Sequence, residues 1–150
     1  MKVLDRVSML LQQKGRDIYS VASDESVYAA LSMMADKDVG ALLVINDGRL
    51  VGMISERDYA RKVILRGKSS RETLVGEIMT HSPITISCDA PVEEAMRTMT
   101  DHRIRHLPVL DSEERLIGVV SIGDLVSWIM RSQDEVIAHL EHYITGDLLH

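Results

Sequence analysis

The chain has 150 residues and a mass of 16.8 kDa, which suits one compact domain or two small packed ones and excludes a large multidomain enzyme. Hydrophobic residues at 45% and charged residues at 27% are typical of a globular chain and not of a disordered one. The net charge of −6 disfavours a general polyanion-binding surface, and the single cysteine, Cys88, excludes an intramolecular disulfide and a multi-cysteine metal cluster.

The N-terminal segment, residues 3–13, is a helical candidate, with Gly15 beyond it as a C-cap. It carries Asp5 and lacks the apolar core and small-residue cleavage site of a secretory signal. The longest apolar run, residues 41–45, is far below the ~20 residues of a membrane helix. We therefore predict a cytoplasmic protein with no membrane partner.

Two similar stretches follow, each predicted to fold in the order β-α-β-β-α. In the first, strands are expected at residues 18–21, 41–45 and 50–54, an amphipathic helix from residue 27, and a second helix reaching about residue 65. The matching strands of the second lie at 84–86, 106–110 and 116–120, with helices from residue 92 and to about residue 130. Pro108 has no amide proton, so its strand should lie at a sheet edge or spare that amide from the ladder.

The two stretches are copies of one another in register. A shift of 65 places superimposes their apolar positions, and one extra residue in the second turn changes the shift to 66. An insertion confined to a turn is what a structural repeat tolerates. Chance similarity of two αβ stretches would not also keep polar residues in register, as happens for Asp24 and Asp89, Ser55 and Ser121, and Asp58 and Asp124.

Residues 66–71 are small, polar and basic, which indicates a surface linker. At the far end, Val136, Ile137, Leu140 and Ile144 form a helical stripe that Gly146 can terminate. Each half has about 50–60 residues, a size at which burial only marginally offsets chain entropy, so the halves should pack together. We divide the chain into an N-terminal helical flank (1–16), repeat 1 (17–66), a linker (67–74), repeat 2 (75–131) and a C-terminal helical flank (132–150).

The most informative motif is Gly-h-h-Ser-x-x-Asp, in which h is apolar, at residues 52–58 and again at 118–124. Ser-x-x-Asp before a helix is a capping box, which contributes about 1 kcal/mol without any ligand. A cap alone does not require the glycine, or Asp in place of the commoner Glu or Gln. A strand that opens a helix also aims free amide groups at a phosphate, and the carboxylate could accept from two ribose hydroxyls. Capping and nucleotide binding can hold at once.

The repeat, the element order, the doubled motif and the stretch IRHLPV at residues 104–109 resemble the cystathionine-β-synthase (CBS) domain family. The resemblance covers residues 15–131 and is to a tandem pair, often called a Bateman module. It implies an α/β (α+β) fold of two repeats packed as a pseudo-twofold pair with short flanking helices. In that family, two clefts between the repeats commonly bind adenosine-containing ligands.

The resemblance also implies a role for each matched residue. Asp58 and Asp124 would bind ribose hydroxyls, and Ser55 and Ser121 would lie near the ribose or the first phosphate. The pair Arg105 and His106 would meet phosphate. The adenine slot would be lined by Tyr19, Val39 and Gly40 in one copy and by Thr80, Ile84, Ile104 and Arg105 in the other.

The copies differ at the phosphate position. Arg105 and His106 correspond to Gly40 and Ala41, although Arg57 could partly substitute in the first copy. Because Arg offers a forked donor set, we expect phosphate-bearing ligands to prefer the second copy. An Arg or His at a strand edge is also commonly a solvated surface group.

No catalytic or metal site emerges from the sequence. His102 and His106 have helical metal-pair spacing, but the helix should end near residue 101. Cys88 lacks the neighbours of a nucleophile, and no Gly-x-Ser-x-Gly or phosphate-binding loop motif occurs. The nine methionines fall mostly at core spacings.

Three functions remain open. The first is a non-catalytic sensor of AMP, ADP, ATP, NAD or S-adenosylmethionine, homodimeric through its flanking helices and acting on a separate target protein; those helices could equally cover the protein's own core. The second is a dimerisation or docking module with vestigial clefts that regulates a separate enzyme or transporter. The third and weakest is nucleic-acid binding by the basic residues 61–71.

Overall fold

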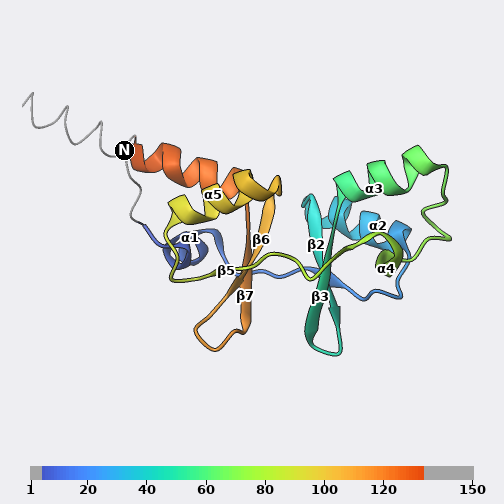
Figure 1. The fold of residues 1–150 in the computed structure, drawn as a ribbon, viewed down its shortest axis with the longest axis horizontal. Helices are drawn as coiled ribbons and strands as arrows, with labels where there is room; N and C mark the ends of the chain where they lie inside the picture. Colours follow the sequence, from blue (N-terminus) through green and yellow to red (C-terminus); the bar gives the residue numbers. More distant parts are fainter. Residues whose placement is uncertain (1–4, 134–150) are drawn as a thin grey trace, which may run out of the picture. The chain divides into compact units, whose positions relative to one another are not determined.

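The computed structural model describes residues 5–133 (Figure 1). The predicted C-terminal stripe, residues 136–144, lies outside the described residues. The chain divides into two compact units that do not follow the order of the sequence. Residues 17–85 form one unit, and residues 5–16 join residues 86–133 to form the other. We call them the first-repeat unit and the second-repeat unit.

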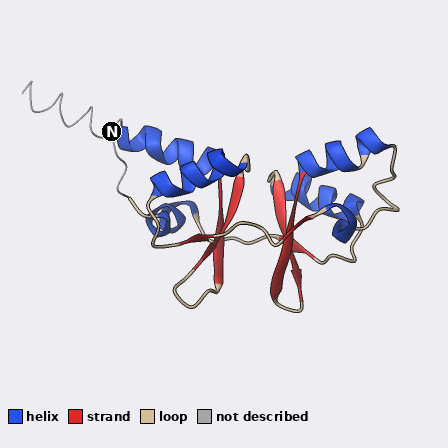
Figure 2. Ribbon diagram, in the orientation of Figure 1, coloured by secondary structure: helices blue, strands red, loops and turns tan. Residues whose placement is uncertain are grey.

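The first-repeat unit is built on a four-stranded sheet in the order β1-β2-β3-β4. Strand β1 runs parallel to β2, and the other neighbours are antiparallel. The helices lie against this sheet (Figure 2). The elements in chain order are β1 (Ser20–Val21), α2 (Val27–Lys37), β2 (Ala41–Asn46), β3 (Arg49–Ser55), α3 (Glu56–Lys62), the 3₁₀ turn η1 (Ile64–Arg66), α4 (Val75–Ile78) and β4 (Thr80–His81).

The second-repeat unit has a three-stranded sheet in the order β5-β6-β7. Residues 122–133 are helical and continue directly from the last strand. Both units therefore follow the predicted order β-α-β-β-α, and the predicted α/β fold class is confirmed. The named elements are α1 (Val7–Lys14), β5 (Ile86–Ser87), α5 (Val92–His102), β6 (His106–Leu110) and β7 (Leu116–Ser121).

The two hairpins pair in the same register. Ala41 lies opposite Ser55 in one and His106 opposite Ser121 in the other, and both registers shift at the same place, after Val44 and after Val109. The helices α2 and α5 end alike, with Asp38 and Arg103 in the left-handed conformation. The two copies therefore share their irregular features as well, namely the register shift in the hairpin and the left-handed residue at the helix end.

Each unit encloses its own hydrophobic core. In the first-repeat unit, alternate β2 residues Leu42 and Val44 pack with the apolar stripe of α2, which includes Ala30 and Met34. Leu107 and Val109 of β6 do the same with α5 in the second-repeat unit. These side chains are at most 2% exposed, as the period-2 and period-3.6 patterns require.

A short helix from the neighbouring repeat completes each core. Val7, Leu10 and Leu11 of α1 are buried in the second-repeat unit, and Val75, Ile78 and Met79 of α4 and its C-cap occupy the same positions in the first-repeat unit. The Val92 amide donates to the Asp5 carbonyl at 2.7 Å, and the Val27 amide donates to the Thr73 carbonyl at 2.8 Å. Helices α1 and α4 are therefore counterparts. Helix α1 comes directly before repeat 1 in the sequence but packs on repeat 2, and α4 comes directly before the strands of repeat 2 but packs on repeat 1.

This exchange corrects one expectation: the segment before repeat 2, which contains α4, packs on repeat 1. Residues 66–69 and 71 are exposed, as expected of a surface linker, but this linker is attached to the first-repeat unit, because the Ser70 carbonyl accepts from the Tyr28 amide at 2.9 Å and Thr73 beyond it is buried. Of the two roles left open for the flanking helices, dimer contact and cover for the protein's own core, α1 has the second, so it gives no support for a homodimer.

Pro108 lies in β6, the middle strand of its sheet, so the predicted edge position is wrong. The other expectation holds, because the Pro108 nitrogen takes no part in the pairing with β5. Its counterpart Leu43 donates its amide to the Tyr19 carbonyl at 3.2 Å, whereas proline has no proton to donate. Accordingly β5 pairs with β6 only from Val109 onward, one position later than β1 pairs with β2.

The predicted ends of two helices also shift. Helix α1 spans Val7–Lys14 and has Gly15 as its C-cap, as expected; the Gly15 φ of 105° suits glycine, and its amide donates to the Leu11 carbonyl. The helix expected to reach residue 65 stops at Lys62, and the 3₁₀ turn η1 follows.

Leu11→Ala tests whether α1 is part of the core. Leu11 is 0% exposed, so its truncation should lower the free energy of unfolding by about 2–5 kcal/mol. Met9 on the same helix is 44% exposed, and Met9→Ala should change it by about 0.5 kcal/mol or less. Urea unfolding measures both, and equal small losses would contradict the packing of α1.

Candidate functional site

Both Gly-h-h-Ser-x-x-Asp motifs form the turn from the last strand of a hairpin into the following helix. The Asp58 amide donates to Ser55 Oγ at 3.2 Å, while the Ser55 amide donates to Asp58 Oδ2 at 3.0 Å. In the second repeat the corresponding distances between Ser121 and Asp124 are 3.1 and 2.9 Å. The capping boxes predicted from the spacing are therefore present in both repeats.

The glycine of each motif has a packing role. A Cβ on Gly118 would lie 2.9 Å from a methyl group of Leu11, and one on Gly52 would lie 2.8 Å from the Thr80 carbonyl oxygen and 2.5 Å from the Met79 sulfur. Each glycine thus admits the helix exchanged from the other repeat. The glycine, which the cap alone did not explain, needs no ligand to account for it.

Alanine at these glycines should destabilise the protein unequally. Gly118→Ala meets a flexible leucine side chain, whereas Gly52→Ala also meets backbone that cannot turn away. Overpacking of this kind costs about 1–3 kcal/mol, and we expect Gly52→Ala at the upper end and Gly118→Ala at the lower end. Chemical denaturation of the two variants would contradict this account if neither lost stability.

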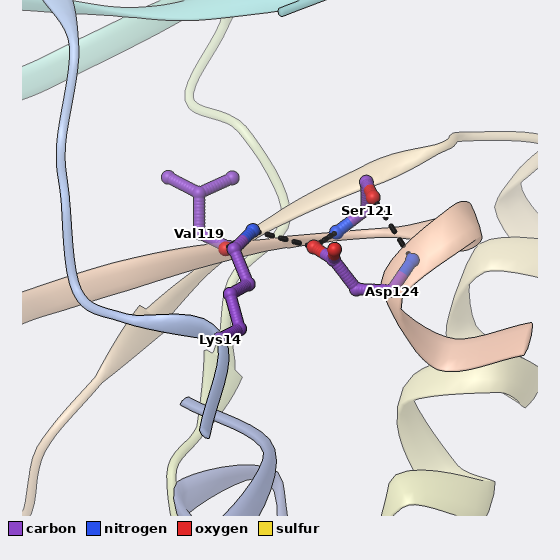
Figure 3. Close-up of polar contacts among 4 residues, drawn as sticks. All are labelled: Lys14, Val119, Ser121 and Asp124. Carbon is purple, nitrogen blue, oxygen red and sulfur yellow. Dashed lines mark hydrogen bonds and ion pairs between the residues drawn. The ribbon is translucent and has the colours of Figure 1, made fainter. Parts of the chain in front are cut away.

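Asp124 is held by a lysine that sequence reasoning missed. Lys14, the last residue of α1, donates from Nζ to Asp124 Oδ2 and to the Val119 carbonyl oxygen, the latter at 2.7 Å (Figure 3). Burial opposes ionisation of Asp124, but the hydrogen bonds from Lys14 and Ser121 outweigh it and lower the Asp124 pKa. The carboxylate is thus ionised at neutral pH and half-buried.

Asp58 is also paired with a lysine, but a local one. Lys62 lies four residues later on α3, with Nζ 3.1 Å from Asp58 Oδ1 and 2.8 Å from the Ile78 carbonyl oxygen. The i, i+4 spacing is a signal that could have found Lys62 in the sequence. Lys14 is 110 positions from Asp124 and gives no such signal.

Arg105 and His106 lie beside the second motif. The Arg105 carbonyl accepts from the Ile122 amide at 2.8 Å, and His106 is opposite Ser121 in the hairpin. Burial, then the positive charge of Lys14, lowers the His106 pKa; Asp124 opposes this shift and Arg105 adds to it. The sequence-predicted cluster of Arg105, His106, Ser121 and Asp124 is therefore assembled within one unit, and Lys14 joins it.

His106 should make stability depend on pH. Because the His106 pKa is lowered in the folded protein, the unfolded chain binds the extra proton first as the pH falls below about 6.5, which favours unfolding. His106→Gln should therefore reduce the loss of thermal stability between pH 7.5 and 5.5. His81→Gln, at an exposed position on β4, is the control, and an equal effect of both variants would contradict the assignment.

The remaining predicted site residues divide between the units. In the first-repeat unit, the Gly40 carbonyl accepts from the Glu56 amide at 3.1 Å, as Arg105 does for Ile122, and Arg57 is exposed on the first turn of α3. Thr80 and Ile84 belong to the first-repeat unit. Ile104 and Arg105, predicted to line the same adenine slot, belong to the second-repeat unit. Tyr19 lies just before β1, with Lys37 Nζ 5.5 Å from its ring, and Val39 follows α2.

His102 and His106 lie on different elements, α5 and β6, so they do not share a helix face. Among residues 5–133, no group of three His, Cys, Asp or Glu side chains is placed to hold a metal ion. Over the same residues, no helix is both long enough and apolar enough to cross a bilayer.

Comparison with known proteins identifies the family. The family model described as the CBS domain matches residues 15–65 and 75–131. The chain belongs to the CBS domain family. It is 40% identical over 149 residues to "CBS domain-containing protein CBSX3, mitochondrial" of Arabidopsis thaliana, a match that covers 93% of this chain and 72% of that protein.

Solved structures confirm the tandem arrangement of CBS repeats. A protein with CBS domains from Burkholderia ambifaria is 45% identical with a TM-score of 0.82, covering 86% of this chain and 96% of that chain. A CBS domain protein from Pyrobaculum aerophilum, complexed with AMP, is 31% identical with a TM-score of 0.70, covering 80% and 89%. A CBS domain pair in complex with 5′-methylthioadenosine and S-adenosyl-L-methionine is 26% identical with a TM-score of 0.75, covering 87% and 98%.

Proposed function

We propose that this CBS protein is a non-catalytic regulatory module that senses an adenosine-containing ligand at the motifs of its two repeats. The observation that carries the proposal is the assembly of an ionised, half-buried Asp124 beside Arg105 and His106 at a strand-to-helix turn. Relatives of the same family hold AMP or S-adenosylmethionine. The ligand class is adenosyl compounds, and AMP, ADP, ATP, NAD and S-adenosylmethionine are the candidates.

Each proposed role follows from the chemistry of the group. An ionised carboxylate accepts hydrogen bonds only, so Asp124 and Asp58 suit ribose hydroxyls, which can donate. Ser121 and Ser55 stand beside them through the capping boxes. Arg105 and His106 would meet phosphate. The residues proposed to line adenine are Tyr19, Val39, Gly40, Thr80 and Ile84 in the first-repeat unit and Ile104 and Arg105 in the second-repeat unit.

The two repeats should bind with different affinities. The second-repeat unit has Arg105 and His106 where the first has Gly40 and Ala41, and charge-assisted contacts to phosphate are the strong ones. Arg57 is the cation nearest in sequence to Asp58 that could reach a ligand in the first repeat. We place the tighter phosphate-bearing ligand at the second repeat.

As a sensor, the module must bind its ligand with different affinities in two conformations. A ligand with equal affinity for both would not change the equilibrium between them. The proposal includes a homodimer acting on a separate target protein, without nucleic acid and without catalysis. It also includes a cytoplasmic location, although the Arabidopsis relative is named as mitochondrial.

A thermal-unfolding panel with the five candidate ligands tests this function. At 100 times its dissociation constant, one ligand stabilises the folded state by about 2.7 kcal/mol, which raises the midpoint by roughly 5–10 °C for a chain of this size. Asp124→Asn should abolish most of the rise because asparagine presents one acceptor and loses the charge. The asparagine side-chain oxygen can still accept from the Ser121 amide, so the unliganded variant should stay folded.

Asp58→Asn is the matched variant in the first repeat and should affect a phosphate-bearing ligand less. Mass spectrometry of the purified protein establishes that it starts free of nucleotide. If none of the five ligands shifts the midpoint of nucleotide-free protein, the sensor function is wrong and the docking module takes its place.

A further inference from the structure

The second-repeat carboxylate is already occupied in part. Asp124 Oδ2 accepts from Lys14 Nζ and, at 2.9 Å, from the Ser121 amide. A carboxylate oxygen has about two lone-pair sites, so this oxygen is fully used. A ribose whose two hydroxyls each reach one carboxylate oxygen can bind only if Lys14 leaves.

We propose that Lys14 selects nucleoside phosphates at the second repeat: it pairs with Asp124 in the empty site and, displaced by ribose, pairs with the phosphate of the ligand. This inference rests on the proposed function and deepens it. A neutral nucleoside would displace the lysine without giving it a new partner. A nucleoside phosphate would compensate the lost ion pair, and Lys14 would therefore raise the selectivity for phosphorylated ligands.

The charges around Asp124 favour an anionic ligand. Lys14 and Arg105 carry fixed positive charges that both act on His106, against the single negative charge of Asp124. The cluster therefore has an excess of positive charge before any ligand binds. A phosphate supplies the missing negative charge, and its contacts with lysine and arginine are charge-assisted.

Lys14 is placed to change partners. It is the last residue of α1, its side chain is 33% exposed, and Gly15 turns the backbone away directly after it. Leaving Asp124 also gives up the hydrogen bond from Lys14 Nζ to the Val119 carbonyl at 2.7 Å unless the ammonium group keeps it, so the new partner must offer a charged acceptor, as a phosphate does. The four-carbon stem moves the ammonium group without moving the buried face of α1.

Calorimetric titration of AMP and adenosine isolates this role. The measurements use the Asp58→Asn background, so that binding reports the second repeat. The chain without a change at Lys14 should prefer AMP. Lys14→Met should lower the ratio of AMP to adenosine affinity by roughly 10-fold or more, the size expected for one charge-assisted hydrogen bond. Affinity for adenosine should be unchanged or higher, because its competitor is gone.

Lys62→Met in the same background is the matched control. It removes the lysine that pairs with Asp58 in the unchanged chain and that does not contact Asp124, and it should leave the AMP-to-adenosine ratio unchanged. Lys14→Gln, which keeps a hydrogen-bond donor without charge, should lower the ratio as Lys14→Met does. Thermal unfolding without ligand verifies that each variant is folded.

The outcomes separate the two proposals. An unchanged ratio in Lys14→Met, or an equal loss of both affinities, would overturn the role of Lys14 and leave the proposed function standing. A protein that binds neither AMP nor adenosine before Lys14 is changed would overturn the role of Lys14, and the five-ligand panel then decides the sensor function separately.

Discussion

The fold depends on the burial of one face of each small sheet by a helix that belongs to the other repeat. A unit whose first strand has only two residues and that has two helices of its own leaves part of its core open. Leu11 and Met79 fill these openings and lie directly over Gly118 and Gly52. The strand that carries each motif is therefore placed by a segment from elsewhere in the chain, and the capping box then fixes where the following helix begins.

This dependence connects packing to the candidate site. Buried Val7 and Leu10 anchor α1 in the core, and this places its last residue, Lys14, against Asp124 in the first turn of the helix that follows β7. The short α4 has no residue that plays this part at Asp58, and Lys62 of α3 takes it instead. Two motifs with the same spacing therefore have carboxylates held by lysines of different origin, and the surroundings of the two carboxylates are not equivalent.

The sequence was sufficient for what is local or periodic. The strand and helix order, the register of the repeat and both capping boxes followed from apolar spacing and from Ser55, Asp58 and their counterparts. The exchange of α1 and α4 could not be predicted in this way. The apolar positions of α1 and α4 match at a shift of 68 positions and not 65, and a four-residue helix has almost no periodicity. Lys14 was missed for the same reason, since its place depends on tertiary contact alone. The spacing of the Gly-h-h-Ser-x-x-Asp motif likewise does not determine which ligand binds the candidate site.

The exchanged helices bear on how a tandem pair can arise. A chain with a single repeat and its preceding helix could not complete its own core, because that helix belongs to the neighbour. Two such chains, however, would complete each other by mutual exchange. Duplication and fusion of the gene would then join partners that already fitted, with no new interface to evolve. The covalent connection would turn a concentration-dependent association into an intramolecular one, after which the two sites could diverge independently.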